Sequence, residues 1–456
     1  MATENLEDLL ALGERVVESA SKAGADVAEA VVSEGSHLST KVRLGEPELV
    51  EEAGSRAVGL RVMIGQQVAV SYTSDLTDAG LARFVEDALE LARLSQPDEF
   101  AGPPDASLLS ERSQHRDLSL YDPSVHEVDA AAALEHARRA EDAARAADER
   151  ITNSEGATFA RASGAKALVT SGGFRGVNDG TYASLSVHPV ADDSDGKKRS
   201  GFYWSARRFL DGLLSDEEVG REAARRTVAK LGARKVPTQE CPVVFDPEVG
   251  RSILGLLAGC INGSAVWRRS SYLVDRTDST IASDLVTVVD DPLIEGAPGS
   301  RPFDGEGLLS RRNVVVDRGV LKTYLLDSYA ARKLGLESTA SAARGGSGGV
   351  GPSTSNFVLQ PGDTSPEDLL RSTASGLYVT EMMGFGFNAV TGDFSRGASG
   401  FWIENGEKTH PVSEVTISLN LDEILKRIDA VADDLDLRTS IATPTFRVSR
   451  MTLAGS

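Results

Sequence analysis

Two acidic residues in a glycine-flanked segment are the first candidates for chemistry. Asp304 and Glu306 stand two positions apart in the sequence FDGEG at 303–307. In an extended strand, residues at this spacing share a face, where paired carboxylates can bind a hard cation. Between glycines, the same residues favour a turn whose carboxylates accept backbone N–H groups. We favour the turn and keep both residues as candidates for the wall of a substrate cavity.

The glycine-rich stretch GDFSRGASGFWIENG at 392–406 is the second candidate. Its glycines let the backbone approach a ligand closely, and Arg396 offers fixed donors to a peptide carboxylate or carbonyl. Phe394 and Trp402 offer apolar surface, and the strand can pair with an extended peptide by β-addition. The alternative is a hairpin in which Trp402 fills the core and Arg396 pairs with Asp393.

Ser395 lies in the same stretch and raises the alternative of a hydrolase. A serine nucleophile needs a positioned base, and only His410 lies nearby in the sequence. An independent, metal-free hydrolase would have to use Ser395, Asp304 or Glu306.

Metal and nucleotide motifs are not found in the sequence. No two of the six histidines have the i+4 or i+5 spacing that places imidazoles on one helix face, and Cys241 and Cys260 form no CxxC pair. The run GGSGGVG at 345–351 lacks the Lys and Ser/Thr of a P-loop, so we interpret it as a loop or lid. The sequence therefore predicts neither a metal ion nor a cofactor bound by this chain.

Composition narrows the class of protein. The 456 residues carry a formal net charge of −20, which disfavours nucleic acid and anionic membrane surfaces as partners. Neither a signal peptide nor an apolar run of about 18 residues is present, so we expect no membrane span. Two cysteines in apolar settings fit the reducing cytoplasm, which is the expected location.

The sequence pattern predicts an α+β protein in three parts, whose helices and strands position these residues. Residues 1–110 read as a helix, strands at 27–35, 37–45, 57–65 and 67–74, and a helix from Thr77 to Leu94. Residues 120–236 read as an alanine-rich helix at 127–149, antiparallel strands and a charged helix from Asp216. Residues 240–456 begin with a strand at 241–245 and a helix at 247–260, and continue as a β-rich, barrel-like domain with helical insertions.

Long segments of the sequence resemble the TldD/PmbA family, in its PmbA/TldE branch. The resemblance is carried by the segments TSGGFRGVNDGTYASLSV, PVVFDPEVGRSILGLLAGCINGSAVWRRSSYLVDR, DDPLIEGAPGSRPFDGEG, LKTYLLDSYAARKLG and LYVTEMMGFGFNAVTGDFSRGASGFWIENGE. The family resemblance implies a cytoplasmic heterodimeric protease of TldD and TldE that encloses a cavity for unfolded or small peptides. It also implies that TldD holds zinc with an HExxxH helix and a further C-terminal ligand, and that TldE supplies no zinc ligand.

This sequence departs from the TldD pattern on the helix after Asp246. The first histidine position holds Leu254, the glutamate position Gly255 and the second histidine position Gly259. Leucine and glycine cannot bind zinc or activate a water molecule. Glycines at this spacing instead allow close approach of another backbone.

The resemblance implies a non-catalytic, TldE-like subunit whose partner is a TldD-like HExxxH protein that holds the zinc. The substrate would be a peptide or a peptide-like molecule. Three alternatives stay open: a pair dedicated to natural-product biosynthesis, the independent metal-free hydrolase and a scaffold without peptide contact.

Overall fold

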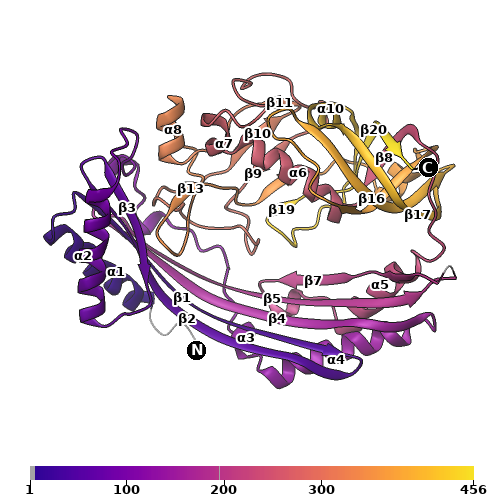
Figure 1. Cartoon of the computed structure of the whole chain (residues 1–456), viewed down its shortest axis with the longest axis horizontal. Coiled ribbons are helices and arrows are strands. Elements are labelled where there is room, and N and C mark those ends of the chain that lie inside the picture. Colours follow the sequence, from indigo (N-terminus) through magenta and orange to yellow (C-terminus); the bar gives the residue numbers. More distant parts are fainter. Residues whose placement is uncertain (1–5, 195, 456) are drawn as a thin grey trace.

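The computed structural model describes residues 6–194 and 196–455 (Figure 1). A long, curved sheet with its helices forms one layer, and the C-terminal half of the chain lies over the opposite face of that sheet. The chain is thus an α+β protein, as the sequence predicts. None of the described helices combines the length and apolarity needed to cross a bilayer.

The N-terminal half supplies the sheet and the helices that cover it. Its helices are α1 (Leu6–Lys22), α2 (Asp78–Leu94), α3 (Pro123–Glu127), α4 (Ala130–Ala146) and α5 (Asp216–Val228), with short 3-10 turns at Ala106–Leu108, Arg112–Gln114 and Leu210–Gly212. Its strands are β1 (Val27–Arg43), β2 (Glu46–Ile64), β3 (Gln67–Thr73), β4 (Ile151–Thr170), β5 (Arg175–Asp192), β6 (Lys198–Ser200) and β7 (Tyr203–Arg207).

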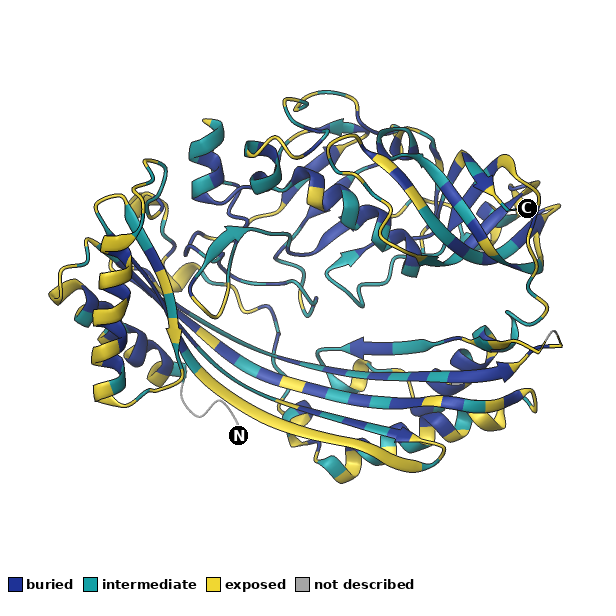
Figure 2. Cartoon of the chain, viewed as in Figure 1, coloured by how far each residue is buried: buried dark blue, intermediate teal, exposed yellow. Residues whose placement is uncertain are grey.

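These seven strands form one antiparallel sheet in the order β3-β2-β1-β4-β5-β6, with β7 also paired to β5. Side chains alternate along each strand, and the even-numbered apolar residues of β1 pack under α1 and α2 at one end and under α4 and α5 at the other. The half of β2 that β3 does not cover, from Glu46 to Arg56, is exposed along its length (Figure 2).

The opposite face of the sheet contacts the C-terminal half through a buried ion cluster. Glu29 on β1 accepts hydrogen bonds at Oε2 from Nη1 of Arg61 (2.9 Å) and from Nη2 of Arg344 (2.8 Å). Arg344 also donates to the carbonyls of Gly305 and Gly348, so it joins the sheet to the glycine-rich loop at 345–349. Burial would raise the pKa of Glu29, but the two guanidiniums outweigh it and hold the pKa below its ordinary value.

The C-terminal half contains a closed barrel. Its strands are β8 (Gln239–Phe245), β9 (Val288–Asp290), β10 (Asn313–Asp317), β11 (Val320–Leu321), β12 (Ala342–Arg344), β13 (Val350–Pro352), β14 (Phe357–Leu359), β15 (Ser375–Met383), β16 (Asp393–Glu404), β17 (Glu407–Asn420), β18 (Ile428–Val431), β19 (Ile441–Ala442) and β20 (Phe446–Ala454). Its helices are α6 (Pro247–Ile261), α7 (Gly263–Trp267), α8 (Ser328–Leu334), α9 (Pro366–Arg371) and α10 (Leu421–Lys426).

The barrel closes because β17 pairs with both β16 and β20, which completes the ring β17-β16-β15-β8-β20. Helix α6 packs beside it, against β15, β14 and β19. One large apolar core unites α6 with the inner faces of these strands. The predicted barrel-like character of this region is therefore confirmed.

Several elements agree closely with the sequence predictions. Thr77 caps α2, and Asp246 caps α6 by accepting the backbone N–H of Glu248 at 2.9 Å. Other bounds differ. The strands predicted at 27–35 and 37–45 are one strand, β1, and the helix predicted at 127–149 is interrupted at Val128 and Asp129, where Asp129 caps a new helix.

Candidate functional site

Helix α6 is the element on which the resemblance puts the zinc ligands of TldD, and part of its surface is bare backbone. Leu254 is 4% exposed and packs in the core. A Cβ added at Gly259 would meet no heavy atom within 4 Å, and one at Gly255 would meet only Cδ1 of Ile441 at 4.0 Å. The space beside Gly259 is therefore open, and Gly255 has room for a side chain next to Ile441.

The side chains present do not fit a zinc ion. Among residues 6–194 and 196–455, no three His, Cys, Asp or Glu side chains gather in a group that could hold a metal. Burial raises the thiol pKa of both Cys241 and Cys260 to about 11, which opposes the thiolate that zinc requires. We therefore derive no chemical step through zinc in this chain.

Arg396, predicted from the sequence, reaches α6 from strand β16. Its Nη1 donates to Oγ of Ser252 at 3.0 Å, and its Nε is buried without a hydrogen-bond partner among the described residues. The guanidinium carbon lies 5.7 Å from the ring centroid of Phe394. Asp393 instead accepts hydrogen bonds from Thr391 and Asn420, so the alternative Arg396–Asp393 pair is not formed. Arg396 thus keeps donor capacity beside the outer side of α6.

The other predicted residues of this stretch divide between core and surface. Phe394 (3% exposed) and Trp402 (8% exposed) belong to the apolar core. Ser395 is exposed and pairs with Ser418 in the sheet, whereas His410 pairs with Trp402 further along the same ladder. No hydrogen bond between Ser395 and a histidine is present in the described part of the chain. A Ser395–His410 pair would need a hydrogen bond that this geometry does not supply.

Asp304 and Glu306 lie together in a buried turn between β9 and β10. Asp304 accepts the backbone N–H groups of Glu306 (2.9 Å), Leu308 (3.0 Å) and Ala342 (3.1 Å). Glu306 accepts from the backbone N–H and the hydroxyl of Ser328 at 2.8 and 2.7 Å. This is the turn geometry that the glycines favour. No described contact joins the two carboxylates to the stretch at 392–406.

Burial raises the pKa of both carboxyl groups. The pKa of Glu306 rises to about 7, because its burial is reinforced by the neighbouring charge of Asp304. Asp304 keeps three backbone donors, which favour its charged form. The pair therefore carries less than two full charges near neutral pH.

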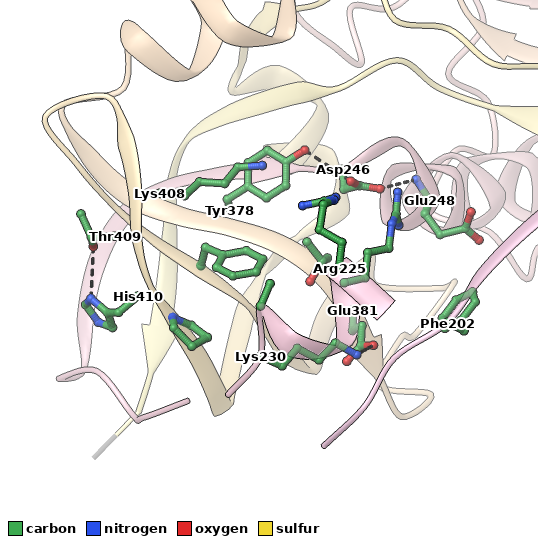
Figure 3. A pocket seen from close by; sticks show the side chains of 15 residues that line it. Phe202, Arg225, Lys230, Asp246, Glu248, Tyr378, Glu381, Lys408, Thr409 and His410 are labelled. Atoms are coloured by element: carbon green, nitrogen blue, oxygen red, sulfur yellow. Dashed lines mark hydrogen bonds and ion pairs between the residues drawn. The ribbon is translucent and has the colours of Figure 1, made fainter. Parts of the chain in front are cut away.

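A pocket of about 340 Å³ opens between α5 and the outer surface of the barrel (Figure 3). Arg225, Arg226 and Lys230 come from the C-terminal end of α5 and the turn after it, whereas Tyr378 and Lys408 come from β15 and β17. Its apolar surface includes Phe202, Phe401, Ala229 and Pro411. The pocket thus combines an apolar wall with several cations, a composition typical of small-molecule sites.

Among the charged residues of this pocket, Lys408 has an unusual position, over an aromatic ring. It is an exposed residue overall, but its Nζ stands over the ring of Tyr378, 3.2 Å from the centroid. Desolvation lowers the pKa of Lys408 to about 8, with Arg225 and Arg226 acting in the same direction and Asp246 opposing them. The hydroxyl of Tyr378 donates to Oδ2 of Asp246 at 3.3 Å, which keeps the ring in place beneath the amine.

The comparisons with known proteins cover nearly the whole chain. Family models described as PmbA/TldA metallopeptidase domain 1, central domain and C-terminal domain match residues 28–92, 123–231 and 238–455. The metalloprotease PmbA of Escherichia coli O157:H7 is 38% identical over 430 residues, covering 94% of this chain and 92% of that protein. A PmbA homologue of Haemophilus influenzae is also 38% identical, over 441 residues, covering 96% of this chain and 94% of that protein.

Solved structures agree with these sequence matches. A Bacteroides thetaiotaomicron protein given as a candidate modulator of DNA gyrase superposes with a TM-score of 0.91 at 27% identity, covering 98% of both chains. TldE of Thermococcus kodakarensis shares the fold, with a TM-score of 0.85 at 22% identity, covering 97% of this chain and all of that one. A curved sheet carrying a five-stranded barrel is thus the fold of a known class of metallopeptidase-related proteins. The chain belongs to the TldD/PmbA family and fits its PmbA/TldE branch.

Proposed function

We propose that this chain is the non-catalytic, TldE-like subunit of a zinc metallopeptidase, and that a TldD-like HExxxH chain is its partner. The partner would hold the zinc, and this chain would complete a cavity that admits small or unfolded peptides in the cytoplasm. The observation that carries the proposal is α6. In a family of metallopeptidases, the helix expected to hold HExxxH has Leu254 in the core and glycines at 255 and 259.

The surroundings of α6 support contact with another molecule. The space beside Gly255 and Gly259 is open, and Arg396 directs partly unpaired donors toward the same helix. Glycine backbone and unpaired guanidinium donors both suit an extended peptide or a second chain. Asp304 and Glu306 are weaker candidates for the cavity wall, because both are buried and accept hydrogen bonds within their own turn and from Ser328.

Co-expression with an HExxxH homologue from the same source tests the proposed assembly. We expect a one-to-one complex in gel filtration with mass measurement. Two subunits that share a cavity should bury at least the roughly 1,000 Å² that a stable, specific interface needs. Two separate peaks at micromolar concentrations of both chains would contradict a heterodimer.

Arg396→Ala tests the proposed contact with peptide. The variant complex should show a KM for an unstructured peptide raised about tenfold, since a hydrogen bond from a charged donor contributes about 1.5–3 kcal/mol. Assembly with the partner should be unchanged. Arg371→Ala, which removes an exposed arginine of α9 paired with Asp368, is the matched control and should leave KM unaltered. Equal kinetic constants for the wild-type and Arg396→Ala complexes would make the stretch at 392–406 purely architectural.

A further inference from the structure

The pocket between α5 and the barrel contains a lysine, Lys408, that forms no direct ion pair with a described carboxylate. In contrast, every other described lysine except the exposed Lys166 pairs with a carboxylate. Lys166 borders a different pocket, so what sets Lys408 apart is its position over the Tyr378 ring, in a pocket that Arg225 and Arg226 also line.

The acidic residues of the pocket are already engaged with other groups. Asp246 caps α6 and accepts from Tyr378, and Glu381 pairs with Lys230. Glu248 pairs with Arg251 and accepts from the indole of Trp204 at 3.1 Å. Each of these carboxylates is thus committed to a group other than Lys408. An anionic ligand from outside the chain would give Lys408 the direct ion pair that it lacks here.

The two arginines of α5 strengthen the case for an anionic ligand. Arg225 binds Glu222 through Nε and Nη2, and Arg226 binds the same carboxylate through Nε alone. Each guanidinium therefore keeps donors that these bonds do not use. Both side chains line the pocket that contains Lys408, and Figure 3 shows Arg225 projecting into it.

The size and wall of the pocket define the rest of the ligand. A volume of about 340 Å³ lies at the lower end of the range of roughly 300–1,000 Å³ typical of small-molecule sites, which suits one or two amino-acid residues. Phe202, Phe401 and Pro411 offer an apolar wall beside the cations. A carboxylate joined to an apolar side chain matches both halves of this surface.

We propose that this pocket binds the free C-terminal carboxylate of a short peptide, with Lys408 as its counter-cation. The peptide nature of the ligand rests on the proposed function, whereas the carboxylate is inferred from the pocket alone. A peptide end held here would lie at the junction of α5 and the barrel.

Paired ligands that differ only in charge test the proposal on the full chain without a partner. N-acetyl-phenylalanine and N-acetyl-phenylalaninamide have nearly the same size and the same apolar group. We expect the acid to bind at least about tenfold more tightly than the amide in calorimetric or ligand-observed NMR titrations, because only the acid forms charge-assisted hydrogen bonds. Lys408→Met should weaken binding of the acid by about the same factor, and Lys408→Arg should restore it. Lys166→Met is the control and should change nothing.

Chemical labelling gives a second readout that uses the wild-type protein and so does not depend on how a variant folds. Because the pKa of Lys408 is about 8, its amine should be acetylated at pH 8 faster than that of Lys166, as followed by peptide mass spectrometry. The acid should slow labelling of Lys408 only, and the amide should not. Equal binding of acid and amide, unchanged binding by Lys408→Met, or equal protection by inorganic phosphate would each overturn the carboxylate assignment. These results leave assembly with the HExxxH partner untouched, so they are distinct from a failure of the proposed function.

Discussion

Peptidase activity on an unstructured peptide should appear when this chain is combined with its HExxxH partner and should fall to background when either chain is omitted. The proposal places zinc in the partner, so omitting the partner would remove the zinc-bound water, whose contribution of several kcal/mol corresponds to a rate loss of more than about 100-fold. Without this chain, the cavity lacks the wall that we assign to α6 and Arg396. Misplacement of a substrate by about 1 Å can by itself cost roughly 100-fold.

The measurement is the rate of cleavage of a fluorogenic peptide by each chain alone and by the purified complex. A folded protein with an exposed loop serves as the control substrate and should be cleaved poorly by the complex. A partner that is fully active alone would contradict the need for this subunit. Activity of this chain alone, abolished by Ser395→Ala, would favour the independent hydrolase instead.

Glu29→Ala should cause a large loss of stability, although Glu29 is a polar residue. Glu29 is 1% exposed and is the shared acceptor of Arg61 and Arg344, whose side chains are 11% and 3% exposed. Removing one partner of a buried ion pair leaves uncompensated charge and costs about 3–5 kcal/mol. Two guanidiniums would be left in the interface between the sheet and the C-terminal half, so we expect urea denaturation at markedly lower concentration.

Glu18→Ala is the matched control for this prediction. Glu18 pairs with Lys22 on the surface of α1, where the side chains are 72% and 76% exposed, and such pairs contribute about 0–1 kcal/mol. Because the pKa of Glu29 is lowered in the folded protein, its stabilisation is complete above the pKa of the unfolded state and is lost as the pH falls through the folded-state pKa. The difference between wild type and Glu29→Ala should therefore shrink in acid. Equal losses for the two variants at neutral pH would show that the ion cluster does not hold the two halves together.

The sequence predicts helix starts and turns best, because single residues act there on the backbone of their own neighbours. The helix predicted at 247–260 agrees with α6, whose start is set by the Asp246 cap and by Pro247, and such capping acts within one turn. The strands predicted at 57–65 and 67–74 agree with the paired parts of β2 and β3 for the same reason, since the turn residues between them act locally.

Long strands escaped prediction because glycine at their centre resembles a turn. Gly35 lies in the middle of β1 and pairs with Gly164 of β4. A Cβ at Gly35 would meet the carbonyl oxygen of Ser163 at 3.2 Å, so close packing of neighbouring strands explains this glycine. That contact joins residues more than a hundred positions apart, and local periodicity cannot reveal it.

The candidate site was predicted only in part for the same reason. Arg396 could be singled out because glycines and aromatic residues surround it in the sequence. Lys408, Tyr378 and Arg225 could not, because β15, β17 and α5 bring them together through long-range pairing. The one signal in the sequence was the ENGEKTH turn, which places a lysine at the start of β17 without indicating what it faces.

Elemental analysis for zinc, combined with native mass measurement, tests the central claim most directly. The account predicts about one zinc per heterodimer and less than stoichiometric zinc in this chain purified alone, because neither α6 nor any other described element groups suitable ligands. The zinc should disappear when a histidine of the partner's HExxxH motif is substituted. About one tightly held zinc per copy of this chain alone, lost on substitution of one of its own residues, would contradict the account.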